Sequence, residues 1–326
     1  MSTLLDRIAQ VGERPAQMSP SPYHRMSSVP IRQELPRVSE YQRDKRSLRN
    51  CNIAAAIFHL ISFGAALAVT LVFLEGSAQV ALTTDFLAYD ANATVSNGGT
   101  APDQAGPFSQ VCRVLGYYQI IWVLEFEPLI TAIFHAVIAG VPAVNEYYSR
   151  NVLLAGRNPI RWAEYSITAT MMIWVIAQVS GITNVVWLVV LALSNVALQY
   201  TGYVMEDMNL EPRKEKPVRW VGTVLGWLLF VAQWVPVFTY FFAVITSDRP
   251  PTAEMVPVFV YLVVFGLFFL FSLFGLVVTL HYLGWPRWLA PLINYERAMV
   301  TLSFVAKFAL TWIILIGVAT NQRGAM

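Results

Sequence analysis

Seven long, almost uninterrupted apolar stretches restrict this chain to a membrane fold. Their approximate ranges are 53–74, 114–140, 160–182, 185–205, 219–245, 256–282 and 298–318. A helix needs about 20 apolar residues to cross the hydrocarbon core of a bilayer, and each stretch meets this length. Hydrophobic residues make up 56% of the chain and charged residues only 13%, which excludes an ordinary soluble domain. The sequence therefore predicts an all-α membrane protein, a bundle of seven transmembrane helices.

Basic residues are distributed unevenly between the two sides of the predicted bundle. Loops on the cytoplasmic side of membrane proteins carry an excess of Lys and Arg. Of the 22 Lys and Arg residues, 18 fall on the side of the N-terminus. Arg161 is one of them and is counted in the loop after the second span. Only Arg113, Arg249 and Arg323 fall on the other side, while Lys307 lies within the last span. We therefore expect a cytoplasmic N-terminus and an extracellular C-terminus.

The chain divides into three parts. Residues 1–49 are rich in Pro, Ser and Arg, which predicts a disordered, basic, cytoplasmic tail. Residues 50–320 form the seven-helix domain, and residues 321–326 form an outer C-terminal tail. A long outer loop, from about 76 to 112, contains no Lys or Arg and carries an N-glycosylation acceptor pattern at Asn92. No metal-ligand cluster or nucleotide-binding glycine pattern is found, and we expect neither an enzyme nor a nucleic-acid partner.

Lys307 interrupts the last apolar stretch, within "SFVAKFALTW". It lies ten residues beyond Arg297, which places it about 15 Å from the inner surface, near the bilayer midplane. A charged group at this depth is costly and is expected to face the interior of the bundle. Two interpretations remain open. Lys307 either forms a buried ion pair that fixes helix packing or, as a desolvated and neutral amine, condenses with an aldehyde to form a Schiff base.

Glu164 is the candidate partner of Lys307. It lies five residues after Pro159, about 7 Å into the membrane from the inner side. Side chains on a helix lean toward its N-terminus, so Lys307 is expected to reach down toward the level of Glu164. A protonated Schiff base carries a positive charge and needs a carboxylate of this kind close by.

Three further polar side chains lie at compatible depths. A single membrane histidine, such as His59 or His135, more often makes a helix–helix hydrogen bond than takes part in chemistry. Two histidines together with a lysine and a carboxylate indicate a hydrated, proton-accepting pocket. Ser303 lies one turn before Lys307 on the same helix face and can hydrogen-bond the lysine or its counterion.

Two more carboxylates lie in the second span, within "VLEFEPLIT". At about 100° per residue, Glu125 and Glu127 project roughly 80° to either side of the His135 direction. They cannot both point the same way, so we expect one to face the interior and the other to face a neighbouring helix, a dimer partner or the distortion at Pro128. Glu254, at the outer end of the sixth span, is a further candidate for a proton relay. The alternative is that Glu125 and Glu127 are both protonated and inert.

Several segments together resemble the heliorhodopsins. They are "IFHLISF", "AIFHAVIAG", "IRWAEYSITATMMIWVIAQVSGI", "VFVYLVV" and "ERAMVTLSFVAKFALTW". The resemblance covers roughly residues 50–318. The N-inside topology that follows from the basic residues is a hallmark of this family and is opposite to that of G-protein-coupled receptors.

The resemblance implies all-trans retinal bound to Lys307 as a protonated Schiff base, with Glu164 as counterion. It also implies that His59, His135 and Ser303 form a polar cluster beside the Schiff base, and that the protein is a homodimer whose interface includes the long outer loop. The family positions of the retinal pocket are Trp162, Met172, Asn195, Trp234, Phe271 and Trp312. Ser272 and Val278 depart from the family pattern and are expected to alter the absorption maximum.

Three classes of function remain open. The first is a photoreceptor with a slow photocycle that signals to an unknown partner. The second is light-driven or light-gated proton transport, in which Glu164, Glu127, Glu125 and Glu254 supply stations along the path. The third is a receptor or transporter for a small ligand without retinal, in which Lys307 is only an ion-pair partner.

Overall fold

The computed structural model describes residues 38–74, 79–89, 108–210, 217–247 and 256–324. The predicted glycosylation site at Asn92 and the predicted relay residue Glu254 lie outside these ranges, as do residues 1–37 of the predicted tail.

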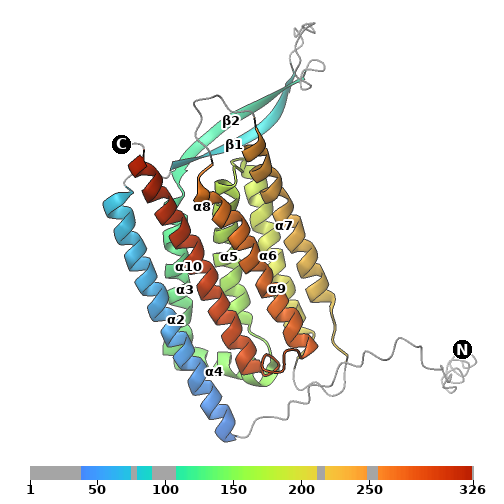
Figure 1. Cartoon of the computed structure of the whole chain (residues 1–326). Helices are drawn as coiled ribbons and strands as arrows, with labels where there is room; N and C mark the ends of the chain where they lie inside the picture. The colour runs from blue at the N-terminus through green and yellow to red at the C-terminus, as the bar shows by residue number, and fades with distance from the viewer. Residues whose placement is uncertain (1–37, 75–78, 90–107, 211–216, 248–255, 325–326) are drawn as a thin grey trace, which may run out of the picture. The chain divides into compact units, whose positions relative to one another are not determined.

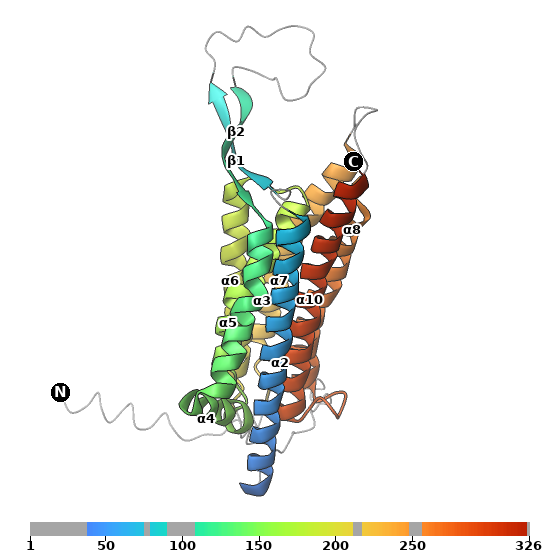
Figure 2. The ribbon, with the colours of Figure 1, turned by 90° about the vertical axis from the view of Figure 1, so that its left-hand side faces the viewer.

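The described part is mostly helical, and its long helices lie side by side as a bundle (Figures 1 and 2). The long helices are α2 (Val38–Phe73), α3 (Ile121–Gly140), α5 (Pro159–Val179), α6 (Val185–Asp207), α7 (Val221–Thr246), α9 (Leu267–Leu283) and α10 (Leu292–Gly324). The short α8 (Val258–Tyr261) and a π-helical turn, η3 (Leu262–Gly266), lead directly into α9. Together these three segments cover the sixth predicted span.

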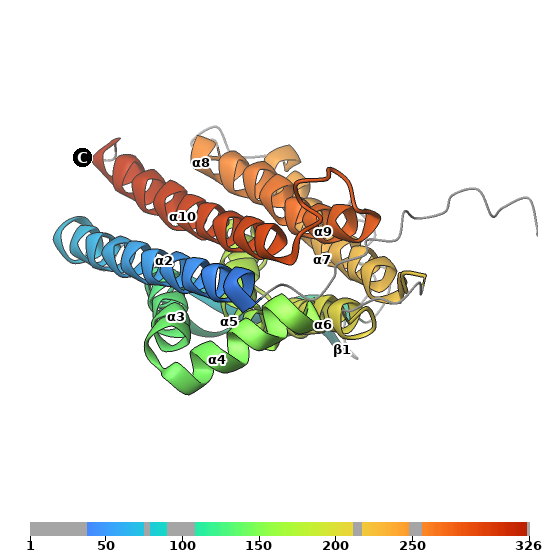
Figure 3. The same cartoon turned by 90° about the horizontal axis from the view of Figure 1, so that it is seen from below.

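The two ends of the bundle differ. At one end, α4 (Pro142–Arg150) runs across the bundle and continues into the π-helical turn η2 (Asn151–Ala155) (Figure 3). At the other end lies a hairpin of two strands, β1 (Gln79–Tyr89) and β2 (Phe108–Gln119). We call these the α4 end and the hairpin end. The helix α2 begins at the α4 end, whereas α10 finishes at the hairpin end (Figure 1).

The hairpin corrects two sequence-based expectations. Residues 114–119, predicted to begin the second span, belong to β2, and residues 79–89 and 108–112 of the predicted outer loop form strands. The apolar and aromatic residues of this segment suit a strand as well as a helix. Residues 121–140 already supply a full membrane span, so β2 is free to pair antiparallel with β1. The backbone N–H of Thr83 donates to the carbonyl of Thr183 at 2.9 Å, which ties β1 to the turn between α5 and α6.

Two helices extend beyond their predicted limits. The first begins at Val38, so residues 38–49 of the predicted disordered tail are helical. The last begins at Leu292 and continues to Gly324, into the predicted C-terminal tail. Lys, Arg and Glu are good helix formers, so a helix can continue past the apolar segment that fixes its position in the membrane.

Six helical segments of the described chain are long and apolar enough to cross a membrane: Val38–Phe73, Ile121–Gly140, Val185–Asp207, Val221–Thr246, Val258–Leu283 and Leu292–Thr320. The helix α5, with 21 residues, is not among them. Eleven of its residues are buried, including Arg161, Glu164 and Thr168. A helix that is largely surrounded by protein does not need an apolar surface toward lipid, so α5 can carry these buried polar residues.

The hydrophobic core lies among α3, α5, α6, α7, η3, α9 and α10, with Ile173, Leu188, Trp234, Phe241 and Leu310 almost fully buried. This packing fixes the rotation of α5 and α10 about their axes. Their polar side chains consequently meet inside the bundle.

Candidate functional site

Lys307 lies on α10 inside the bundle, where only 3% of its surface is exposed. Its ammonium group donates to the carboxylate of Glu164 on α5 and, at 2.5 Å, to the hydroxyl of Thr131 on α3. A second carboxylate, that of Glu127 on α3, lies 3.4 Å from the same nitrogen. The lysine thus meets two acids on two different helices.

Glu164 accepts more hydrogen bonds than Glu127. Besides Lys307, its Oε1 atom accepts from the hydroxyls of Thr131, at 3.0 Å, and Thr168, at 2.9 Å. Hydrogen bonds of this kind stabilise the charged form of a buried carboxyl group. The surroundings of Glu164 therefore suit a carboxylate that faces a permanent positive charge.

The structure separates Glu125 from Glu127, in agreement with the angular argument from the sequence. Glu127 points toward Lys307 and also lies 3.3 Å from the Thr131 hydroxyl. Glu125 points toward α2, where the hydroxyl of Thr70 donates to its Oε1 at 2.6 Å. Both carboxyl groups are buried, with 1% and 2% of the residue surface exposed for Glu125 and Glu127, respectively.

The two predicted histidines lie together beside this group. The rings of His59 and His135 are nearly parallel, and their centroids are 6.0 Å apart. The Nδ1 atom of His135 lies 2.7 Å from the side-chain oxygen of Asn52, on α2. Both histidines are buried. Sequence reasoning missed Asn52, because a single Asn in a helix carries no signal of its own.

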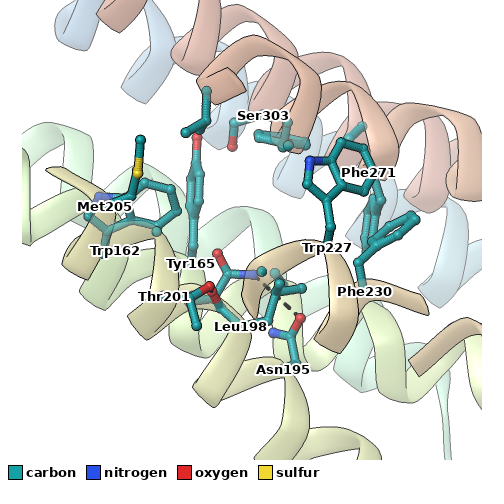
Figure 4. A pocket seen from close by; sticks show the side chains of 18 of the residues that line it. Trp162, Tyr165, Asn195, Leu198, Thr201, Met205, Trp227, Phe230, Phe271 and Ser303 are labelled. Atoms are coloured by element: carbon teal, nitrogen blue, oxygen red, sulfur yellow. Dashed lines mark hydrogen bonds between the residues drawn. The ribbon is translucent and has the colours of Figure 1, made fainter. Parts of the chain in front are cut away.

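A cavity begins at Lys307 and extends between α5, α6, α7, α9 and α10. Its empty volume is about 870 Å³, including the part that opens to the outside. In Figure 4, Trp162 and Met205 lie at one end, and Trp227, Phe230 and Phe271 lie at the other. The lining is almost entirely apolar, which is typical of a site for an apolar ligand.

Four of the six predicted pocket residues line this cavity, namely Trp162, Met172, Asn195 and Phe271. Ser303, one turn before Lys307 on α10, lines it as well. Sequence reasoning missed further lining residues, including Tyr165, Trp227, Phe230 and Phe274. Aromatic residues are abundant on every helix of this chain, so their spacing alone does not reveal which of them face the cavity.

The placement of Trp234 and Trp312 in the pocket is corrected by the structure. The Trp234 ring lies among aromatic rings next to the cavity, 6.1 Å from the centroid of Phe271, and does not line it. Trp312 faces away from the cavity toward α2, where its Nε1 lies 3.3 Å from the Ser62 hydroxyl. The rotation of α7 and α10 about their axes decides whether these two side chains face the cavity.

The two departures from the family pattern also differ in position. Val278 lines the cavity, whereas Ser272 does not, and the Ser272 hydroxyl donates to the carbonyl of Phe269 in its own helix at 2.7 Å. A direct effect on a ligand in the cavity is therefore expected from Val278 only.

A second polar group lies between Lys307 and the α4 end. Arg161 is buried between the carboxylates of Glu206 on α6 and Glu296 on α10 and donates to both. This burial corrects its assignment to a cytoplasmic loop, and the basic residues assigned to that side fall from 18 to 17. A smaller cavity, with an empty volume of about 340 Å³, extends from Glu164 to Glu296 and is large enough to hold a water molecule.

The residues around the larger cavity fit a retinal chromophore. A buried primary amine borders an apolar, aromatic-lined space, and a carboxylate with two hydroxyl donors lies against that amine. Lys307 would hold the aldehyde end of such a ligand, and Glu164 would face the resulting positive charge.

Comparisons with known proteins agree with this arrangement. A search of curated proteins found no significant match. Two solved structures are similar to this chain, each at 12% sequence identity, and at this identity the likeness shows the fold alone. One is the transmembrane domain and linker region of the Salpingoeca rosetta rhodopsin phosphodiesterase, with a TM-score of 0.57 over 85% of this chain and 73% of that chain. The other is the transmembrane domain of the same protein, with a TM-score of 0.54 over 86% and 89%.

The sequence profile of the heliorhodopsin family matches residues 48–319, which is most of the chain. The match confirms the resemblance that the span and lysine motifs carry. This protein belongs to the heliorhodopsin family.

Proposed function

We propose that this protein is a light-sensing photoreceptor in which all-trans retinal is bound covalently to Lys307 as a protonated Schiff base, with Glu164 as its counterion. Membership of the heliorhodopsin family implies a retinal chromophore. The bound retinal supplies light absorption and photoisomerisation. The protein then passes through a slow conformational cycle and signals to a partner of unknown identity.

The contact between Lys307 and Glu164 at the edge of the aromatic cavity carries this proposal. The lysine must release a proton before its amine can attack an aldehyde, and the carboxylate of Glu164 lies against it as an acceptor. Glu164 then stabilises the positive charge, because it lies against the nitrogen and accepts two further hydrogen bonds from Thr131 and Thr168. The polar cluster of His59, His135 and Ser303 is positioned to exchange protons near this pair.

We further propose that seven helices cross the membrane, with the α4 end facing the cytoplasm. The basic residues support this orientation, because the sequence assigns 17 of the 22 to the cytoplasmic side after Arg161 is removed. The helix α5 would be the seventh span, enclosed by the other six.

The hairpin is the proposed contact surface of a homodimer. It exposes several apolar side chains, and Leu87 and Tyr117 are 69% and 63% exposed. Exposed apolar side chains on a strand ribbon favour association with a second copy.

Proton transport is the alternative function, and one observation favours it. Glu127 offers a second carboxyl group at the lysine nitrogen and does not line the polar cavity that leads to Glu296. Photocurrent under voltage clamp separates the two functions. No current at any potential supports the photoreceptor, whereas a current that Glu127→Gln abolishes supports transport.

The colour of the protein tests the primary proposal. Membranes supplied with all-trans retinal are expected to contain a pigment that absorbs visible light and that hydroxylamine bleaches. Lys307→Ala should abolish the pigment, whereas Lys45→Ala, which removes a lysine paired with Glu146 at the α4 end, should retain it. A colourless wild-type protein, or a pigment that survives Lys307→Ala, would contradict the proposal.

A further inference from the structure

Glu127 is the one acid of the described chain, besides Glu164, that lies beside Lys307. It stands six residues after Ile121, about 9 Å along α3 from the hairpin end. Glu164 stands five residues after Pro159, about 7 Å along α5 from the α4 end. The two carboxyl groups therefore approach the lysine nitrogen from opposite ends of the bundle.

Charge balance requires a proton in this group. Lys307 supplies one positive charge, and two ionised acids would leave a net negative charge inside the membrane. An unpaired buried charge is far more costly than a protonated carboxyl group. We therefore expect Glu164 and Glu127 to hold one proton between them.

The hydrogen bonds indicate where that proton lies. Glu164 has three donors, from Lys307, Thr131 and Thr168, whereas the contacts of Glu127 with Lys307 and Thr131 are longer, at 3.4 and 3.3 Å. The negative charge is accordingly better stabilised on Glu164, and the proton belongs on Glu127.

Thr131 connects the two acids. Its hydroxyl oxygen accepts from Lys307 at 2.5 Å and has a second lone pair for the O–H of a protonated Glu127. Its single hydroxyl proton is then donated to Glu164. In this assignment the chain of donation runs from Glu127 through Thr131 to Glu164.

We propose that Glu127 is a second acid of the retinal lysine, which in the dark holds the one proton that it shares with Glu164 through Thr131. This inference rests on the proposed function. Loss of the proton places a second negative charge beside the Schiff base, and the absorption should then shift to shorter wavelength, because excitation moves positive charge away from the nitrogen. An acid on each side of the nitrogen also gives a proton two directions in which to leave.

Other titratable groups face the same region. They are His59 on α2, Tyr165 on α5 and His135 on α3 itself, whereas Glu125 on α3 points toward α2. Glu125 provides a matched control, because it lies on the same helix, has similar burial, and contacts Thr70 instead of the lysine.

The experiment is a pH titration of the dark absorption spectrum of the full-length pigment in lipid nanodiscs. We expect the wild-type spectrum to shift to shorter wavelength in a step as the pH rises. Glu125→Gln should keep this step, Glu127→Gln should lose it, and Thr131→Val should move its midpoint. Light-induced infrared difference spectra should contain a carbonyl stretch of a protonated carboxyl group that Glu127→Gln alone removes.

The outcomes separate the inference from the function on which it rests. A step that persists unchanged in Glu127→Gln overturns the inference and leaves the photoreceptor intact, whereas a colourless wild-type protein overturns both. If Glu127→Gln yields no pigment, Glu127→Asp decides, because it retains a carboxyl group. The step should survive in that variant with a changed midpoint, and its absence counts against the assignment.

Discussion

Lys307 and Glu164 stand 143 residues apart in the chain, and yet the ammonium group of one lies against the carboxylate of the other inside the bundle. Only 3% and 6% of their side-chain surfaces are exposed. The loss of one partner from a buried pair leaves the other charge uncompensated. This pair therefore links the stability of the bundle to the chemistry proposed for it.

Glu164→Gln is expected to shift the pigment to longer wavelength. The variant removes the negative charge that stabilises the ground state of the Schiff base, whereas Thr168 and Thr131 remain in place. Absorption spectra of the purified pigments measure the shift, and Glu125→Gln serves as the control with an unchanged spectrum. An unaltered absorption maximum in Glu164→Gln would assign the counterion role to another residue.

Arg161→Met is expected to destabilise the protein by about 3 to 5 kcal/mol, because it leaves Glu206 and Glu296 buried and without their cation. The matched control is Arg157→Met, which breaks an ion pair with Asp207 whose side chains are 31% and 41% exposed. That change should cost no more than about 1 kcal/mol. Denaturant unfolding in detergent measures the free energy of unfolding of both variants. Equal losses would show that the burial of the Arg161 ion pairs does not increase their contribution to stability.

Gly222→Ala is expected to push α7 away from α6. A Cβ atom at this position would lie 2.7 Å from the backbone nitrogen of Met205 and 2.7 Å from the carbonyl oxygen of Thr201, and backbone atoms cannot move aside cheaply. We expect a loss of about 1 to 3 kcal/mol in stability. Gly64→Ala is the control, because its Cβ would meet nothing within 4 Å. Thermal unfolding gives the melting temperatures of the two variants. Equal melting temperatures would refute the close approach of α7 to α6 at Gly222.

The contact between α2 and α4 is expected to depend on pH. Hydrogen bonds from Lys45 and Arg150 hold the pKa of Glu146 below its usual value of 4.5. Since the folded pKa is the lower one, the contact contributes stability above the unfolded pKa and loses it as the pH falls through the folded value. Glu146→Gln should therefore lower the melting temperature near neutral pH and have no effect in acid.

Melting curves of wild type and Glu146→Gln over a pH series provide the measurement. The double variant with Lys45→Met should show no further loss from the pair. A melting-temperature difference that stays constant from neutral to acidic pH would show that the charge of Glu146 is not responsible.

The membrane bundle could be predicted because its signals are local. Apolar length marks the helices that can cross a bilayer, without any knowledge of packing. The same reasoning failed at residues 114–119, because an apolar, aromatic segment suits a strand as well as a helix, and pairing with β1 decided between them. It also failed for Arg161, which the sequence assigns to a loop and the structure buries between two acids.

The candidate site, too, could be predicted from the sequence only in part. The depth of Lys307 and Glu164 follows from counting residues along two helices, and the opposite directions of Glu125 and Glu127 follow from helix geometry. The sequence could not say which of these two faces the lysine, nor that Trp312 turns toward α2. Lateral distance and helix rotation come from packing against neighbouring helices far away in the chain. By itself, therefore, the sequence determined that a lysine lies buried near the middle of a membrane bundle, and only the tertiary structure decided which acids and which aromatic rings surround it.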